Sequence, residues 1–119
     1  MLYKTLNGRT LIGLIEPITI IWENDKKMTI LAKIDTGASK SSIDSNLTRQ
    51  LGLDNVLKSR IIKSAHGNKL RPIIEAEVHL AKKEFKAEFT VADRSHMTYQ
   101  VLVGVNILKH GFFIDNVAM

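Results

Sequence analysis

The chain has 119 residues, of which 45% are hydrophobic, and it carries a net charge of +5. This length supports one domain, residues 1–119, with one modest core and no second lobe. Because cysteine is absent, disulfides and thiolate-bound metals are excluded. The sequence has no run of 18 apolar residues and no signal-peptide pattern, so we expect a cytoplasmic protein without a membrane partner.

Strand signals dominate the first third of the chain. Residues 10–22, TLIGLIEPITIIW, are rich in β-branched residues, which favours a strand. Pro17 cannot donate a ladder hydrogen bond, so it indicates an edge, a bulge or a bend. Residues 24–27 indicate a turn. The alternation in residues 28–35 predicts a strand with one apolar face, formed by Met28, Ile30, Ala32 and Ile34.

Two short helices are predicted on either side of the next strands. The first covers residues 46–51, with Ser45 as its N-cap and Gly52 as its end. The second covers residues 105–109 and ends at Gly111.

The second half of the chain predicts a hairpin. Apolar and polar residues alternate in residues 74–80 and again in residues 84–92, and the short link 81–83 joins them. The apolar sets are Ile74, Ala76, Val78 and Leu80 in the first strand and Phe85, Ala87, Phe89 and Val91 in the second. These elements together predict an all-β domain with one or two short helices, folded as a closed or partly closed barrel.

A carboxylate stands at the end of the predicted strand 28–35, in the sequence Asp35-Thr36-Gly37-Ala38. Asp-Thr-Gly is a good turn tripeptide, and by itself it favours an ordinary turn. The alternative is that the carboxylate meets an identical one from a second chain. Two carboxylates about 3 Å apart share a proton, so one can polarise a peptide carbonyl while the other activates water. Thr36 would then brace the loop and Ser39 would bond the outer carboxylate oxygen.

A second element of the sequence favours the catalytic interpretation over the ordinary turn. Residues 101–108, VLVGVNIL, form a strand that runs into a glycine and then a helical turn. With the Asp-Thr-Gly-Ala loop, this pattern resembles the retropepsins, the retroviral-type aspartic proteases. The resemblance implies that Asp35 is catalytic, that residues 36–39 support its loop, and that Val103 and Gly104 form the second strand–glycine element.

The resemblance extends to one microbial branch, whose members are labelled ATP-dependent zinc proteases or RimK-associated proteases. It rests on KIDTGA at residues 33–38, HGNKLRPII at 66–74 and the segment from DRSHMTYQVLVG to FFID at 93–115. It spans roughly residues 10–116. Where the branch has proline and arginine, this chain has Gln100 and Val105.

Neither zinc nor ATP is expected as a cofactor. The four histidines, His66, His79, His96 and His110, lack a metal-ligand spacing, and the chain has neither an H-E-x-x-H helix nor a phosphate-binding P-loop. We therefore expect surface or turn histidines and no metal site. His66 is the exception, because it precedes Gly67 at a predicted hairpin tip, where it could meet substrate.

One Asp-Thr-Gly per chain implies a two-fold homodimer with Asp35 from each copy. Residues 61–74 would form a flap over the bound peptide. No acidic residue lies between Asp54 and Glu75, a stretch rich in lysine and arginine. The substrate-binding residues expected in the flap are Lys63, His66, Gly67, Lys69 and Arg71. This basic stretch, together with the resemblance, favours acidic, glutamate-rich peptides.

The sequence thus predicts a homodimeric aspartic endopeptidase. The alternatives are a retropepsin-like module that binds peptides without cleaving them, and a nucleic-acid-binding barrel that uses the basic stretch. The last ranks lowest, because the stretch contains no aromatic residue on which bases could stack. We therefore expect a peptide or protein substrate and no nucleic acid.

Overall fold

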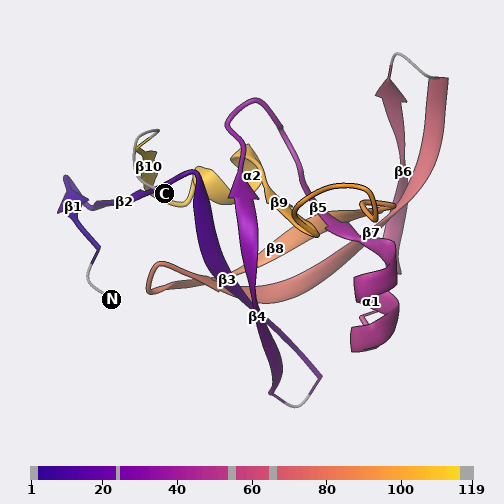
Figure 1. The fold of residues 1–119 in the computed structure, drawn as a ribbon, viewed down its shortest axis with the longest axis horizontal. Helices are drawn as coiled ribbons and strands as arrows, with labels where there is room; N and C mark the ends of the chain where they lie inside the picture. The colour runs from indigo at the N-terminus through magenta and orange to yellow at the C-terminus, as the bar shows by residue number, and fades with distance from the viewer. Residues whose placement is uncertain (1–2, 24, 54–55, 65–66, 116–119) are drawn as a thin grey trace.

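A computed structural model describes residues 3–23, 25–53, 56–64 and 67–115. The chain folds into two β-sheets and two short helices (Figure 1). The first strands are β1 (Thr5–Leu6), β2 (Arg9–Ile12), β3 (Ile15–Trp22), β4 (Lys26–Ile34) and β5 (Ser41–Asp44). Helix α1 (Ser45–Leu51) precedes β6 (Val56–Ser64), β7 (Gly67–Leu80) and β8 (Lys83–Ala92). The chain continues through β9 (Val101–Val103), α2 (Val105–Leu108) and β10 (Phe112–Ile114).

Six strands close into a barrel. They are hydrogen-bonded in the order β3-β4-β9-β5-β8-β7, and β7 also pairs with β3, which completes the ring. The β4–β9 and β5–β8 pairings are parallel, and the others in the ring are antiparallel. The predicted all-β barrel with two short helices is confirmed. None of the described helices is long and apolar enough to span a membrane.

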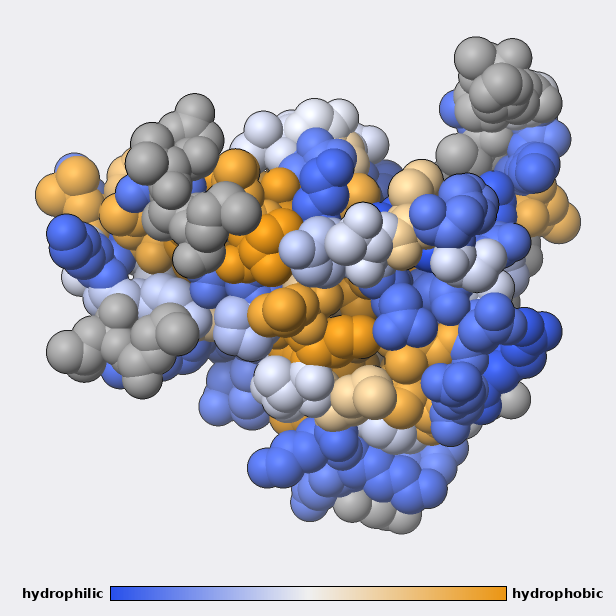
Figure 2. All heavy atoms as spheres, viewed as in Figure 1, coloured by the Kyte–Doolittle hydropathy of each residue, from blue (hydrophilic) through white to orange (hydrophobic). Residues whose placement is uncertain are grey.

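The barrel interior follows the predicted alternation. Ile74, Ala76, Val78 and Leu80 of β7 are buried, whereas Glu75 and Glu77 are exposed. Burial of such apolar side chains contributes most of the favourable free energy of folding. On the face shown in Figure 2, hydrophobic residues gather over the middle strands, and hydrophilic residues cover the β3–β4 turn and the region around α1. Thr90, a polar residue of the alternating pattern in residues 84–92 and therefore expected on the outer face, is buried, with 8% of its surface exposed.

The two hairpin turns explain where strands end. Ala81 and Lys82 join β7 to β8 with φ values of 48° and 70°, the left-handed pair that a two-residue hairpin turn requires. Lys83 already belongs to β8 and pairs with Leu80. At the β3–β4 turn Asp25 has φ 68°, and β4 begins at Lys26, two residues earlier than predicted.

The predicted flap is a hairpin of β6 and β7. Its register runs from Val56 opposite Ile74 to Ser64 opposite Gly67. This hairpin projects beyond the barrel (Figure 1). Strand β7 has 14 residues, so it continues from the flap into the barrel wall. His66, predicted at the tip, lies outside the described residues.

The β-rich stretch of residues 10–22 contains two strands, β2 and β3, which belong to different sheets. Strand β2 pairs with β1 and, in parallel, with β10, whereas β3 belongs to the barrel. The corner between them is held by the buried carboxylate of Glu16, which accepts a 2.7 Å hydrogen bond from the backbone N–H of Gly13. Pro17 lies just before the part of β3 that pairs with β7, so it stands on an edge there.

The N-cap of α1 is Asp44 rather than Ser45. The Asp44 carboxylate is buried and accepts hydrogen bonds from the backbone N–H of Leu47, at 3.4 Å, and of Arg94, at 2.7 Å. It therefore connects the helix start to the segment before β9. Gly52 ends the helix in the left-handed conformation, φ 70°, as predicted.

The small sheet β1-β2-β10 is attached to the barrel by Lys83. The Lys83 Nζ donates to the backbone carbonyl oxygens of Gly111 (2.8 Å), His110 (3.2 Å) and Gly8 (3.3 Å). It also lies 5.2 Å from the centre of the Phe112 ring, a cation–π contact.

Candidate active site

The Asp35 loop is fixed by backbone hydrogen bonds at the end of β4. The Asp35 N–H donates to the Val103 carbonyl at 2.9 Å, which extends the β4–β9 pairing by one step. The Gly37 N–H donates to Asp35 Oδ1 at 2.9 Å, and the Ala38 N–H donates to the Asp35 carbonyl at 3.3 Å. Within the described residues, Oδ2 makes no hydrogen bond. A half-buried carboxylate is thus held on one oxygen and free on the other.

Gly104 allows the second strand–glycine element to touch this loop. A Cβ at residue 104 would lie 2.5 Å from the Lys40 carbonyl oxygen and 2.7 Å from that of Ala38. Just beyond it, the Val105 N–H donates to the Ala38 carbonyl at 2.8 Å, and the Asn106 N–H donates to the Ser39 carbonyl at 3.2 Å. The start of α2 therefore binds the outer half of the Asp35 loop.

The buried hydroxyl of Ser41 supports the contact between Gly104 and the Asp35 loop. Ser41 is fully buried, and its Oγ accepts from the Gly104 N–H at 2.9 Å and donates to Asn106 Oδ1 at 2.7 Å. The Asn106 amide in turn donates to the Glu88 carbonyl on β8 at 3.0 Å. Sequence reasoning placed neither Ser41 nor Asn106 in a supporting role. Only the fold reveals it, because the two residues are 65 positions apart.

Thr36 and Ser39 are exposed residues of the Asp35 loop. Neither side chain forms a hydrogen bond within the described part of the chain. The bonds predicted from them, a brace within the loop and a contact to the carboxylate, are therefore not formed in this single copy.

A cavity of about 430 Å³ lies beside the loop and is bordered by Arg71 of the flap strand β7. Its lining combines the loop, β5, the end of β8 and one flap residue: Gly37, Ala38, Ser39, Lys40, Ser41, Ser42, Arg71, Thr90 and Ala92. Of the predicted flap residues, the structure brings Arg71 to the loop. Lys63, Gly67 and Lys69 are exposed farther along the hairpin and do not line this cavity.

Arg94 is a residue that the sequence prediction missed. Its Nε donates to the Tyr99 carbonyl at 3.0 Å, and its Nη1 donates to Ser42 Oγ at 3.2 Å. Burial lowers the pKa of Arg94, while the negative charges of Asp44 and Asp35 favour its charged form. Arg94 is therefore a cation within electrostatic reach of Asp35. It belongs to the DRSHMTYQ segment, whose pattern alone assigns it no role.

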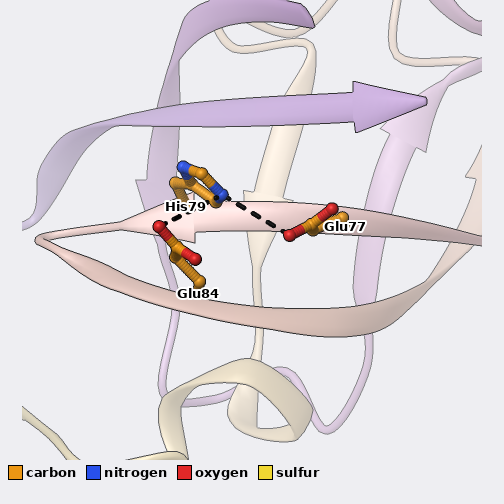
Figure 3. A network of polar contacts seen from close by, with 3 residues as sticks. All are labelled: Glu77, His79 and Glu84. Carbon is orange, nitrogen blue, oxygen red and sulfur yellow. Dashed lines mark ion pairs between the residues drawn. The ribbon is translucent and has the colours of Figure 1, made fainter. Parts of the chain in front are cut away.

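One cluster of potential metal ligands occurs among the described residues. His79 Nε2 lies 3.7 Å from Glu77 Oε1 and 3.7 Å from Glu84 Oε1 (Figure 3). One imidazole nitrogen and two carboxylates could hold a divalent cation. The two glutamate side chains are 47% and 66% exposed, however, and they stand on β7 and β8, away from the Asp35 loop. The group is an exposed ion-pair network that forms no part of the candidate site.

One protein-family model matches this chain. The family model described as RimB-like, retropepsin-like aspartic endopeptidase RimB, matches residues 43–117, which is more than half of the chain. The match begins after the Asp35 loop. No curated protein matches the chain.

Solved structures share the fold at low sequence identity. The Legionella pneumophila protein Lpg0085, of unknown function, has a TM-score of 0.64 and 19% identity, over 92% of this chain and 95% of that one. The protease of simian foamy virus (mac) has a TM-score of 0.58 and 16% identity, over 80% and 91%. The retroviral protease-like domain of Ddi1 from Leishmania major has a TM-score of 0.56 and 23% identity, over 82% of this chain and 73% of that one.

Proposed function

This chain belongs to the RimB-like family of retropepsin-like aspartic endopeptidases, and from that premise we propose that it hydrolyses peptide bonds as a homodimer. One observation carries the proposal. The Asp35 carboxylate stands at the end of a barrel strand with one oxygen bound by the Gly37 N–H, next to a cavity that a flap strand borders. An acidic group so placed is suited to form half of a shared-proton pair.

The second carboxylate would come from Asp35 of another copy. Two carboxylates about 3 Å apart cannot both ionise, so one stays protonated. The protonated Asp35 would donate to the scissile carbonyl, and the ionised Asp35 would take a proton from the attacking water. The exposed Thr36 and Ser39 side chains, which form no hydrogen bond among the described residues, suit a loop that meets its counterpart on a two-fold axis.

Replacing Asp35 by Asn tests the chemistry. We expect Asp35→Asn to lower peptide cleavage about a thousandfold or more, because acid and base functions both depend on the dyad. The matched control is Asp25→Asn, at an exposed turn whose left-handed backbone asparagine tolerates. Full activity of Asp35→Asn, in protein that unfolds at the wild-type denaturant midpoint, would rule out the aspartic mechanism.

We also propose that acidic peptides are preferred. Arg71 lines the cavity beside the loop, and Lys63 and Lys69 are exposed on the same hairpin, so the flap presents positive charge to an incoming substrate. Cleavage of oligo-glutamate peptides should exceed that of neutral peptides at low salt, and the difference should shrink as salt screens the charges. Preference for neutral peptides at low salt would contradict this part.

A non-catalytic peptide-binding module is the second candidate. The observation in its favour is that the matched region, residues 43–117, does not include the Asp-Thr-Gly loop. The two candidates differ in one outcome. The module binds peptide tightly without forming product, whereas the peptidase forms product in proportion to time and loses this ability in Asp35→Asn.

A further inference from the structure

A second cavity, of about 220 Å³, lies between the barrel strands β3 and β4 and the segment that leads into β9. Its lining is mixed: two cations, two apolar side chains and two hydroxyl-bearing residues, namely Lys33, Arg94, Ile15, Met97, Thr98 and Tyr99. The 300–1,000 Å³ typical of pockets for whole small molecules is larger. A volume this small suits a single side chain of a longer ligand.

Lys33 places an available charge at the rim of this cavity. It faces outward from β4, between the buried Ala32 and Ile34, and it is exposed. Two residues of extended chain, about 7 Å, separate it from Asp35. Within the described residues no carboxylate pairs with Lys33, so its ammonium group is free to bind an anion.

Arg94 supplies the second charge in a fixed position. Its backbone N–H is bound by Asp44, its Nε by the Tyr99 carbonyl and its Nη1 by Ser42, so little conformational freedom remains to be lost on binding. In the part of the chain that the structure describes, Nη2 donates no hydrogen bond. A planar guanidinium with donors to spare suits a carboxylate ligand.

We propose that the Lys33–Arg94 cavity is the subsite that binds a carboxylate side chain of the peptide substrate, with glutamate as its best occupant; this inference rests on the proposed peptidase function. The two methylenes of glutamate would pack against Ile15 and Met97, and its carboxylate would reach Lys33 and Arg94. The flap lysines attract acidic peptides in general, whereas this cavity recognises the side chain at one position of the substrate. It is a specificity-determining site and not part of the proton transfer.

The test uses Lys33, because the bonds of Arg94 also hold the local structure. Three peptides of otherwise identical sequence are compared. The first two have blocked ends and carry either glutamate or glutamine at the tested position. The third carries glutamine at that position and has a free C-terminal carboxylate. Their kcat/KM values are measured with wild type, Lys33→Gln and Lys27→Gln. Lys27 is the matched control, since it is exposed on the same strand, six positions away on the same face, and does not line the cavity.

We expect the glutamate-to-glutamine ratio of kcat/KM to fall about three- to tenfold in Lys33→Gln and to stay unchanged in Lys27→Gln. Equal losses in both variants would overturn the proposal, because a long-range field would then explain the preference. A wild-type protein that cleaves both peptides equally well, or that prefers the free C-terminal carboxylate, would overturn it too.

Measurements of peptide binding test the subsite independently of the proposed catalysis. The affinities of the same peptides for Asp35→Asn, with and without Lys33→Gln, are measured by fluorescence anisotropy. A glutamate preference that Lys33→Gln removes supports the subsite even when the wild type forms no product, an outcome that would refute the peptidase alone. Absence of a binding preference overturns the subsite whatever the activity.

Discussion

At the scale of single residues, the candidate site depends on a buried side chain behind the Asp35 loop. The Ser41 hydroxyl joins the strand–glycine element to β5 by accepting from the Gly104 N–H and donating to Asn106 Oδ1. Both partners lie in the wall behind the Asp35 loop. Because Ser41 is fully buried, water cannot replace its hydroxyl without a rearrangement.

Replacing Ser41 by Ala should therefore destabilise the protein by about 1–3 kcal/mol, the cost of leaving a buried donor and acceptor unpaired. Urea unfolding of Ser41→Ala against wild type measures this difference. The exposed Ser39, two residues away, is the control, and Ser39→Ala should change the unfolding free energy by no more than about 0.5 kcal/mol. Equal stability of the two variants would contradict the supporting role of Ser41.

At the scale of elements, one side chain connects the small sheet to the barrel. Lys83 begins β8, and its ammonium group binds three carbonyl oxygens around the β1–β2 turn and the end of α2. The Gly111 carbonyl that it reaches also accepts from the Thr10 N–H of β2. The position of the small sheet on the barrel is thus fixed by a charge-assisted contact as well as by the apolar contacts of Ile12 and Phe112.

Lys83→Met keeps the aliphatic stem and removes these hydrogen bonds. We expect a loss of about 1–2 kcal/mol of stability and faster amide hydrogen exchange at Thr10, with exchange inside the barrel unchanged. Lys82→Met, at the neighbouring exposed position, is the comparison and should leave Thr10 protected. If Thr10 exchanged equally in both variants, the small sheet would not depend on Lys83.

At the scale of the whole molecule, the single Asp35 makes oligomerisation the central question. Each chain carries +5, so two chains together carry +10, twice that value. This self-repulsion weakens association at low ionic strength. The proposed dyad, with one Asp35 from each chain, would also make catalysis depend on how subunits are combined.

Mixing subunits tests this dependence. Adding an equal amount of Asp35→Asn to a fixed amount of wild type, with time for exchange, should reduce total activity to about half, since half of the wild-type subunits then pair with an inactive partner. Asp25→Asn added in the same amount should increase activity in proportion to the added protein. Activity unaffected by added Asp35→Asn would mean that each copy works alone.

The elements that the sequence predicted well are those with a local signal. The two-residue period of residues 74–80 identified the inward face of β7, and Gly52 identified the end of α1. The family and the barrel followed from the Asp-Thr-Gly loop and the strand–glycine element. The N-cap was misplaced by one residue, because Asp44 and Ser45 are both good capping residues. The second bond of Asp44, from Arg94, distinguishes them only in the fold.

What escaped prediction depends on contacts between distant positions. The break between β2 and β3 is held by Glu16, a residue that strand propensity gives no reason to bury. Arg94 acquires its role from Ser42 and the Tyr99 carbonyl, and the cluster at His79 arises because cross-strand register sets it opposite Glu84. Register of this kind is a property of pairing and cannot be read from one strand alone.

Strand β7 has a mechanical consequence. Its last residues are hydrogen-bonded on both sides, to β3 and to β8, within the barrel wall. Its first residues pair with β6 in the projecting hairpin, so one strand joins the hairpin to the barrel. Pro72, opposite Ser59 near the base of the hairpin, provides no amide hydrogen there. The same continuous strand therefore forms both the base of the hairpin and part of the barrel wall, so the two cannot be displaced independently of each other.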